Sequence, residues 1–183
     1  MVVTYNKWLP RIGVLSACLM VALISSAGVR AEEKDPLKDD LLKLNSYTKE
    51  EDQQKQLRLF VKDRDKGRKM VSHAAQMLKE AKGDEKPFNY NGSWILARAA
   101  HYLKQYEIAE KLYELGIEQA SKVKNGKKMV AAYDGLISFY TERKRYADVI
   151  ETCEKFMELT GPKEVGNYQL FVLDKAIRAK ANP

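Results

Sequence analysis

An internal repeat that carries Leu96 onto Leu136 constrains the fold of this chain more than any other feature of its sequence. Shifting the sequence by 40 residues places apolar residues on apolar residues across two expected helices. It also aligns the turn between these helices without a gap. The matched pairs are Leu96 with Leu136, Ala97 with Ile137, Ala100 with Tyr140, Lys104 with Lys144, Tyr106 with Tyr146, Ala109 with Val149, and Ile117 with Met157. Because the period of about 40 residues falls within the range of roughly 20 to 50 that is typical of stacked helical units, we expect a helical solenoid.

Apolar spacing predicts helices in the rest of the chain as well. Between Met70 and Ala81 apolar residues recur at helical intervals, and the sequence holds only ten Gly and five Pro in 183 residues. We expect a capping box at Thr48–Glu51, a helix end at Gly67, and a helix stop at Asn125-Gly126. Residues 83–93 form the longest stretch without helical periodicity. The pattern predicts an all-α protein.

Several residues of the repeat resemble the tetratricopeptide repeat (TPR) family. Tyr106-Glu107-Ile108-Ala109 is similar to the start of that family's second helix, and Tyr113 and Gly116 fall at its later packing positions. In the next unit Tyr133, Leu136, Tyr140, Tyr146 and Phe156 match, and Gly161-Pro162 lies near the closing Pro. The resemblance covers residues 93–162 well and 48–82 only as a degenerate helix pair.

The resemblance implies a right-handed solenoid of helical hairpins with a capping C-terminal helix. Its expected parts are a TPR-like domain at 48–183, with a degenerate pair at 48–82, repeats at 93–121 and 129–161, and a capping helix at 162–181. The period of about 40 residues is longer than the roughly 34 of the family. Val149 also replaces a small Ala. The alternative is a plain bundle of two unrelated amphipathic hairpins.

The first 31 residues have the composition of a secretory signal peptide. Lys7 and Arg11 precede a short apolar run from Ile12 to Ile24, and Val29-Arg30-Ala31 offers a cleavage site before Glu32. The run is shorter than the roughly 18 residues that a membrane-spanning helix needs. Two alternatives stay open, which are an uncleaved anchor and a lipidated Cys18. We expect export to the periplasm or the cell exterior, followed by a charged entry segment at 32–47.

Removal of residues 1–31 lowers the net charge of the chain. The 32 Lys and Arg residues lose Lys7, Arg11 and Arg30, which leaves 29 against 25 acids, or +4. This mild charge does not indicate a nucleic-acid partner. Only Cys153 stays in the mature chain, so no internal disulfide is expected.

The sequence offers no motif for catalysis, a metal or a cofactor. His73 and His101 are the two histidines, and neither has a His or Cys partner three or four residues away. Phosphate-binding loops, nucleophile elbows and Cys-x-x-Cys pairs are absent from the sequence. Asn91-Gly92-Ser93 fits a glycosylation acceptor in the irregular stretch, but such triplets often arise by chance, and chance is the reading we favour unless the source is eukaryotic. We expect no enzymatic activity, no cofactor and no metal site.

The family resemblance implies a binding face on the first helix of each hairpin. It points to Trp94, Arg98, His101 and Tyr102 in one unit and to Asp134, Ser138, Thr141 and Glu142 in the next. Large aromatic residues and Arg supply much of the anchoring energy at interfaces. The alternative is that these side chains form a hydrated surface.

These observations favour an exported scaffold that binds a protein or a peptide segment. Two other hypotheses stay open, a membrane-tethered component of envelope assembly and the N-terminal helical part of a larger protein. A membrane partner is expected only if Cys18 is lipidated or the signal is uncleaved.

Overall fold

Amphipathic periodicity produces helices throughout the part of the chain that the computed structural model describes, which is residues 35–82, 85–123, 125–160 and 166–181. Within these ranges every regular element is a helix, so the all-α prediction is confirmed. The elements are α2 Pro36–Lys43, the 3-10 helix η1 Leu44–Ser46, α3 Glu50–Lys62, α4 Arg64–Glu80, α5 Tyr90–Tyr102, α6 Tyr106–Lys122, α7 Gly126–Glu142, α8 Tyr146–Thr160 and α9 Asn167–Ala181. The predicted signal peptide and Gly161-Pro162 lie outside the described residues.

The backbone reproduces the sequence repeat at the turns between paired helices. Lys104 follows α5 with a φ of 63°, and Lys144 follows α7 with a φ of 56°. Both turns carry the same backbone bonds, because Gln105 N donates to Ala100 O and Arg145 N donates to Tyr140 O, each at 2.9 Å. The next helices, α6 and α8, then begin at equivalent positions of the repeat, Tyr106 and Tyr146.

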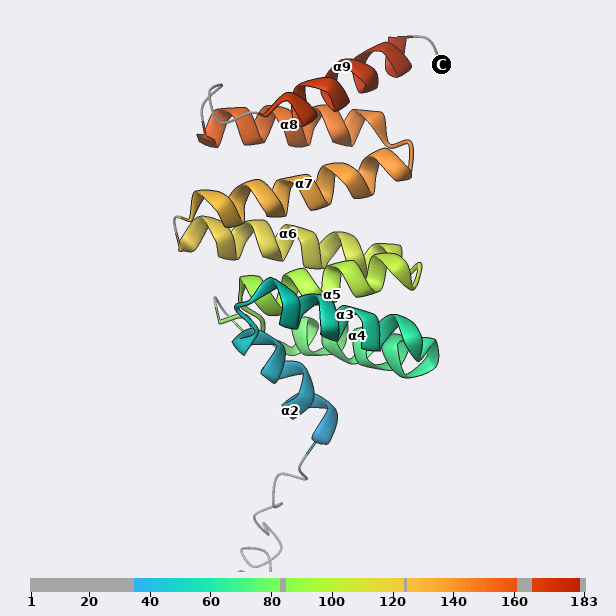
Figure 1. The fold of residues 1–183 in the computed structure, drawn as a ribbon, viewed down its shortest axis with the longest axis vertical. Helices are drawn as coiled ribbons and strands as arrows, with labels where there is room; N and C mark the ends of the chain where they lie inside the picture. Colours follow the sequence, from blue (N-terminus) through green and yellow to red (C-terminus); the bar gives the residue numbers. More distant parts are fainter. Residues whose placement is uncertain (1–34, 83–84, 124, 161–165, 182–183) are drawn as a thin grey trace, which may run out of the picture. The chain divides into compact units, whose positions relative to one another are not determined.

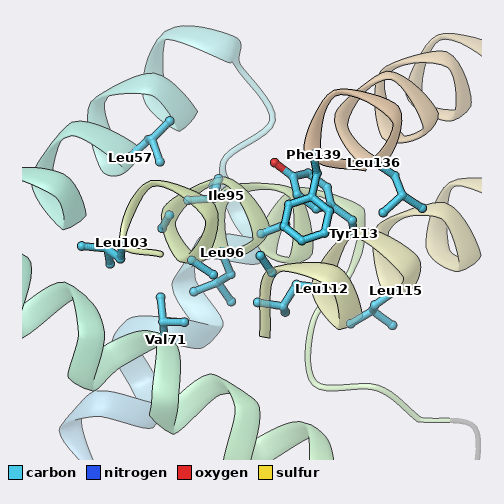
Figure 2. Close-up of a cluster of buried hydrophobic side chains, with 14 of the residues drawn as sticks. Leu57, Val71, Ile95, Leu96, Leu103, Leu112, Tyr113, Leu115, Leu136 and Phe139 are labelled. Carbon is cyan, nitrogen blue, oxygen red and sulfur yellow. The ribbon is translucent and has the colours of Figure 1, made fainter. Parts of the chain in front are cut away.

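The helices from α5 onward stack as successive antiparallel layers (Figure 1). Each helix packs against the next, and α5 also contacts α3 and α7, as α7 contacts α9. Residues from five helices fill the core between α3 and α7, where Leu57, Val71, Leu96, Leu112 and Phe139 come together (Figure 2). Packing against neighbours on both sides explains why α5 is buried nearly all round.

The entry segment packs on this core. Leu41 of α2 and Leu44 of η1 are 0% and 2% exposed, and α2 contacts α4 while η1 contacts α5. Asn45 of η1 accepts a hydrogen bond from the Asn89 N–H through its side chain and donates one to Pro87 O. These bonds hold the chain that precedes α5 against the start of the domain.

Four expectations about local boundaries are wrong. α3 begins at Glu50 after Lys49, without a side-chain cap from Thr48. Asn125 is the N-cap of α7, since its side chain accepts from Lys128 N. α5 begins at Tyr90 with Asn89 as its N-cap, so the stretch 83–93 is shorter than expected. Asn91 is therefore helical and 5% exposed, and it is a poor glycosylation acceptor.

The fourth correction concerns Gly67, which lies inside α4 and not at a helix end. The chain instead breaks at Asp63, whose side chain accepts from Lys66 N as the cap of α4. A Cβ on Gly67 would collide with the carbonyl oxygen of Phe60. The absence of a side chain therefore permits α3 and α4 to approach closely.

Candidate docking cleft

A cleft between α5, α6 and α7 gathers seven of the eight side chains that the sequence marked as a binding face. Its volume is about 540 Å³. The lining residues are Trp94, Arg98, His101, Tyr102, Lys104, Tyr106, Tyr113, Asp134, Gly135, Ser138 and Glu142. We call this hollow the α5–α7 cleft.

Helical spacing and the register of the repeat bring these residues together. Trp94, Arg98 and Tyr102 are spaced by four and share one face of α5. Asp134, Ser138 and Glu142 occupy the equivalent positions of the next repeat, on α7. Because α5 and α7 contact each other, the two faces form one continuous wall.

Trp94 is a half-buried wall of the cleft and packs against the hydrophobic core. Its ring stacks on Tyr90 at 6.2 Å with an interplanar angle of 12° and meets the edge of Tyr113 at 6.1 Å. A Cβ on Gly135 of α7 would lie 2.5 Å from Trp94 Cζ3. Gly135 therefore makes the space in which the indole packs.

Arg98 and Tyr102 are the accessible groups on α5. The Arg98 guanidinium lies over the Trp94 ring at 5.6 Å, and within the described residues it makes no hydrogen bond or ion pair. Tyr102 is 56% exposed, with its ring stacked against His101 at 6.4 Å. Lys104 in the following turn is also exposed and, in the described part of the chain, unpaired. These groups leave two cations and an aromatic face available to a ligand.

His101 joins the two walls of the cleft. Its Nε2 lies 3.0 Å from Glu142 Oε2, and its ring meets the edge of Phe139 at 5.1 Å. Ser138 lines the same cleft, but no hydrogen bond joins Ser138 to His101 among the described residues. Although Ser, His and Glu are the residue types of a catalytic triad, this arrangement lacks the bond that activates the nucleophile.

Asp134 connects the cleft to α9. Desolvation raises the pKa of the Asp134 carboxyl above its usual value, and a hydrogen bond from Gln169 Nε2 of α9 lowers it in part. Thr141 is the predicted residue that does not line the cleft, because its hydroxyl donates to Ile137 O of its own helix at 2.7 Å.

The sequence analysis missed Tyr113, Tyr106, Lys104 and Gly135 as parts of the cleft. One signal pointed to Gly135, because an isolated Gly inside a helical pattern often has a packing reason. Tyr106 gave no comparable signal. Its ring is covered by the Arg143 guanidinium at 3.8 Å, a contact made across two turns of the repeat.

Other hollows in the described residues are lined by different kinds of side chain. The largest of those compared, about 870 Å³, lies where η1, α3 and the start of α4 meet, and its rim mixes acids and bases. A third, of about 340 Å³, contains Glu110, whose carboxylate is paired with Arg145 at 2.8 Å. The first has a single half-buried Tyr, Tyr47, with Asp40, Asp63 and Asp65 beside its bases, and in the second the cation Arg145 is paired. A further hollow of about 810 Å³, which contains Lys79 and Lys111, has no aromatic residue in its lining.

Comparisons with protein-family models, curated proteins and solved structures found no match for this chain. No cluster of three or more potential metal ligands occurs among the described residues. In the same part of the chain, each helix is too short or too polar to cross a membrane. The geometry of the cleft therefore carries the functional argument.

Proposed function

We propose that this protein is an exported scaffold of TPR-like helical hairpins that binds a segment of a partner protein in the α5–α7 cleft. The observation that carries the proposal is the convergence of Arg98, Tyr102 and Trp94 in one hollow of about 540 Å³. Aromatic and Arg side chains are the residues that most often dominate binding energy at protein interfaces. The register of the repeat and the packing of α5 on α7 support the solenoid type.

The free groups of the cleft define the chemistry of the expected segment. The unpaired Arg98 and Lys104 favour a carboxylate, because charge-assisted hydrogen bonds to Arg are strong and directional. The accessible face of Tyr102 favours an apolar or aromatic side chain beside it. The partner segment is therefore expected to carry an acidic residue next to an apolar one.

Affinity purification of the tagged protein from its native host tests this proposal. Arg98→Glu is expected to reduce recovery of a specific partner by at least about tenfold, which corresponds to about 1.4 kcal/mol. The melting temperature should change little, because Arg98 makes no ion pair among the described residues and its contact with the Trp94 ring is worth at most about 1 kcal/mol. Arg58→Glu on the exposed surface of α3 makes the same charge change outside the cleft and is the control. Equal recovery with Arg98→Glu and Arg58→Glu would contradict the proposal.

A further inference from the structure

The last described helix, α9, carries an exposed apolar surface. Leu170, Phe171 and Ile177 are 47%, 65% and 51% exposed, and Leu173 is half-buried between them. On the adjoining side of α9, Val172 and Ala176 are buried against the rest of the stack. The sequence predicts a capping helix at 162–181, and a helix that caps a solenoid needs a polar outer face. α9 does not meet this requirement.

The register of the repeat shows what kind of element covers such a surface elsewhere in the chain. Leu173 and Ile177 correspond to Tyr133 and Ile137 of α7, which are 4% and 0% exposed. In α7 this face lies under α8, where Tyr133 packs on Phe156 with ring centroids 4.9 Å apart. Among the described elements, α9 packs against α7 and α8, and no helix occupies the position that α8 takes on α7 (Figure 1).

We propose that a second copy of this chain covers this face, with α9 packed antiparallel on α9 about a twofold axis. A twofold interface requires a surface that is complementary to itself. Leu170 and Ile177 lie three residues before and four residues after Leu173, so the stripe is nearly symmetric about its midpoint. Antiparallel pairing places Leu170 of one copy beside Ile177 of the other, with the two Leu173 side chains near the axis.

The charges of α9 fit antiparallel pairing. The first half of the helix, residues 167–173, carries no charged residue. The second half carries Asp174, which pairs with Arg178 at 2.8 Å, together with Lys175 and Lys180, so its net charge is +2. Antiparallel helices place each basic end beside the uncharged half of the partner. Parallel helices would place the two halves of net charge +2 side by side, where the excess like charge repels.

The expected dimer is weak and reversible. A helix of 15 residues is about 22 Å long, and one such helix per copy buries less than the roughly 800 Å² per partner of a standard interface. We therefore expect a dimer that dissociates on dilution. A dimer would present two copies of the α5–α7 cleft, which strengthens binding to a partner with two sites.

Sedimentation equilibrium of the purified natural protein, from about 1 µM to 1 mM, tests the inference. The mean mass is expected to rise from one to two times the monomer mass that mass spectrometry gives for the same sample. Ile177→Glu and Leu170→Glu should each shift the midpoint upward by at least about tenfold. Leu59→Glu, a similar change at a Leu of α3 that is 55% exposed, should leave the midpoint in place.

Circular dichroism of each variant shows whether the fold is intact, and two variants are used so that misfolding of one does not decide the result. A monomer mass up to 1 mM would overturn the inference, as would a midpoint that neither α9 variant shifts. Loss of self-association in Leu59→Glu alone would place the interface on another surface and would also overturn it. Because the measurement uses no other protein, its failure is independent of the proposed docking function.

Discussion

At the scale of single residues, Gly135 has a packing role that one substitution can test. Trp94 and Tyr113 approach the position of its missing Cβ to 2.5 and 2.8 Å, and both rings are held by further packing. Gly135→Ala is therefore expected to destabilise the protein by about 1–3 kcal/mol, the usual cost of overpacking. Gly126→Ala, with nothing within 4 Å of the added methyl group, should be neutral or slightly stabilising. Urea denaturation measures both, and equal free energies of unfolding would contradict the close packing of α5 on α7.

Cys153 offers a second test at the residue scale. Burial raises the pKa of its thiol to about 11, and the nearby carboxylates of Asp134 and Glu154 act in the same direction. Because the thiolate reacts and the thiol does not, labelling by a disulfide reagent at pH 8 should be at least about 100-fold slower in the native than in the denatured protein. The raised pKa contributes stability that is present below the ordinary thiol pKa and is lost as the pH rises through about 11. Equal labelling rates in native and denatured protein would show that Cys153 is accessible.

At the scale of helices and turns, two residues with a left-handed backbone conformation occupy equivalent turns of the repeat. Lys104 and Lys144 adopt positive φ angles that favour Gly. Lys104→Gly and Lys144→Gly are each expected to stabilise the protein by about 0.5–1 kcal/mol, whereas Lys111→Gly inside α6 should destabilise it by about 1 kcal/mol. Thermal denaturation of the three variants measures the contrast. A loss of stability in both turn variants would mean that the turns adopt another conformation.

Sequence reasoning found the helices better than it found their ends. Apolar periodicity is a property of each segment, and it predicted the stripes of α4 to α9 without tertiary information. The start of α5 depends on Asn45, which lies 44 residues before Asn89 and binds it through two hydrogen bonds. The start of α3 depends on Gln53, whose amide donates to Tyr47 O. Such side-chain contacts leave no periodic pattern, so the local signal at Thr48 misplaced the start of α3. The other two errors concern local caps, because Asp63 caps α4 four residues before Gly67 and Asn125 caps the start of α7.

The stack as a whole is stabilised where one hairpin packs on the next. Leu136 of α7 is 5% exposed and Leu112 of α6 is fully buried, within one core. Leu136→Ala is expected to lower the free energy of unfolding by about 2–5 kcal/mol, the usual cost of truncating a buried Leu. Leu59→Ala at an exposed site should cost less than about 1 kcal/mol. Similar losses at the two sites, measured by chemical denaturation, would contradict the packing of α6 on α7.

The candidate cleft was more predictable than the surface of α9. The family resemblance placed the binding face on α5 and α7, and the register aligned both helices, so seven of its eight residues line one hollow. The sequence could not show that Gly135 admits the Trp94 ring, because that contact joins two helices. It also predicted a capping helix at 162–181, where the structure exposes Phe171 and Ile177. Apolar periodicity alone does not reveal which of two apolar faces a neighbour covers.

Site-specific photo-crosslinking in the native host tests the central claim, that the α5–α7 cleft holds a partner segment, most directly. A photoreactive phenylalanine analogue replaces Tyr102 in the cleft or, as the control, Leu59 on α3, at sites that are 56% and 55% exposed. The account predicts a defined adduct from position 102 that is absent from position 59 and is lost when Arg98→Glu is added. The same adduct from both positions, or an adduct at 102 that survives Arg98→Glu, would contradict it.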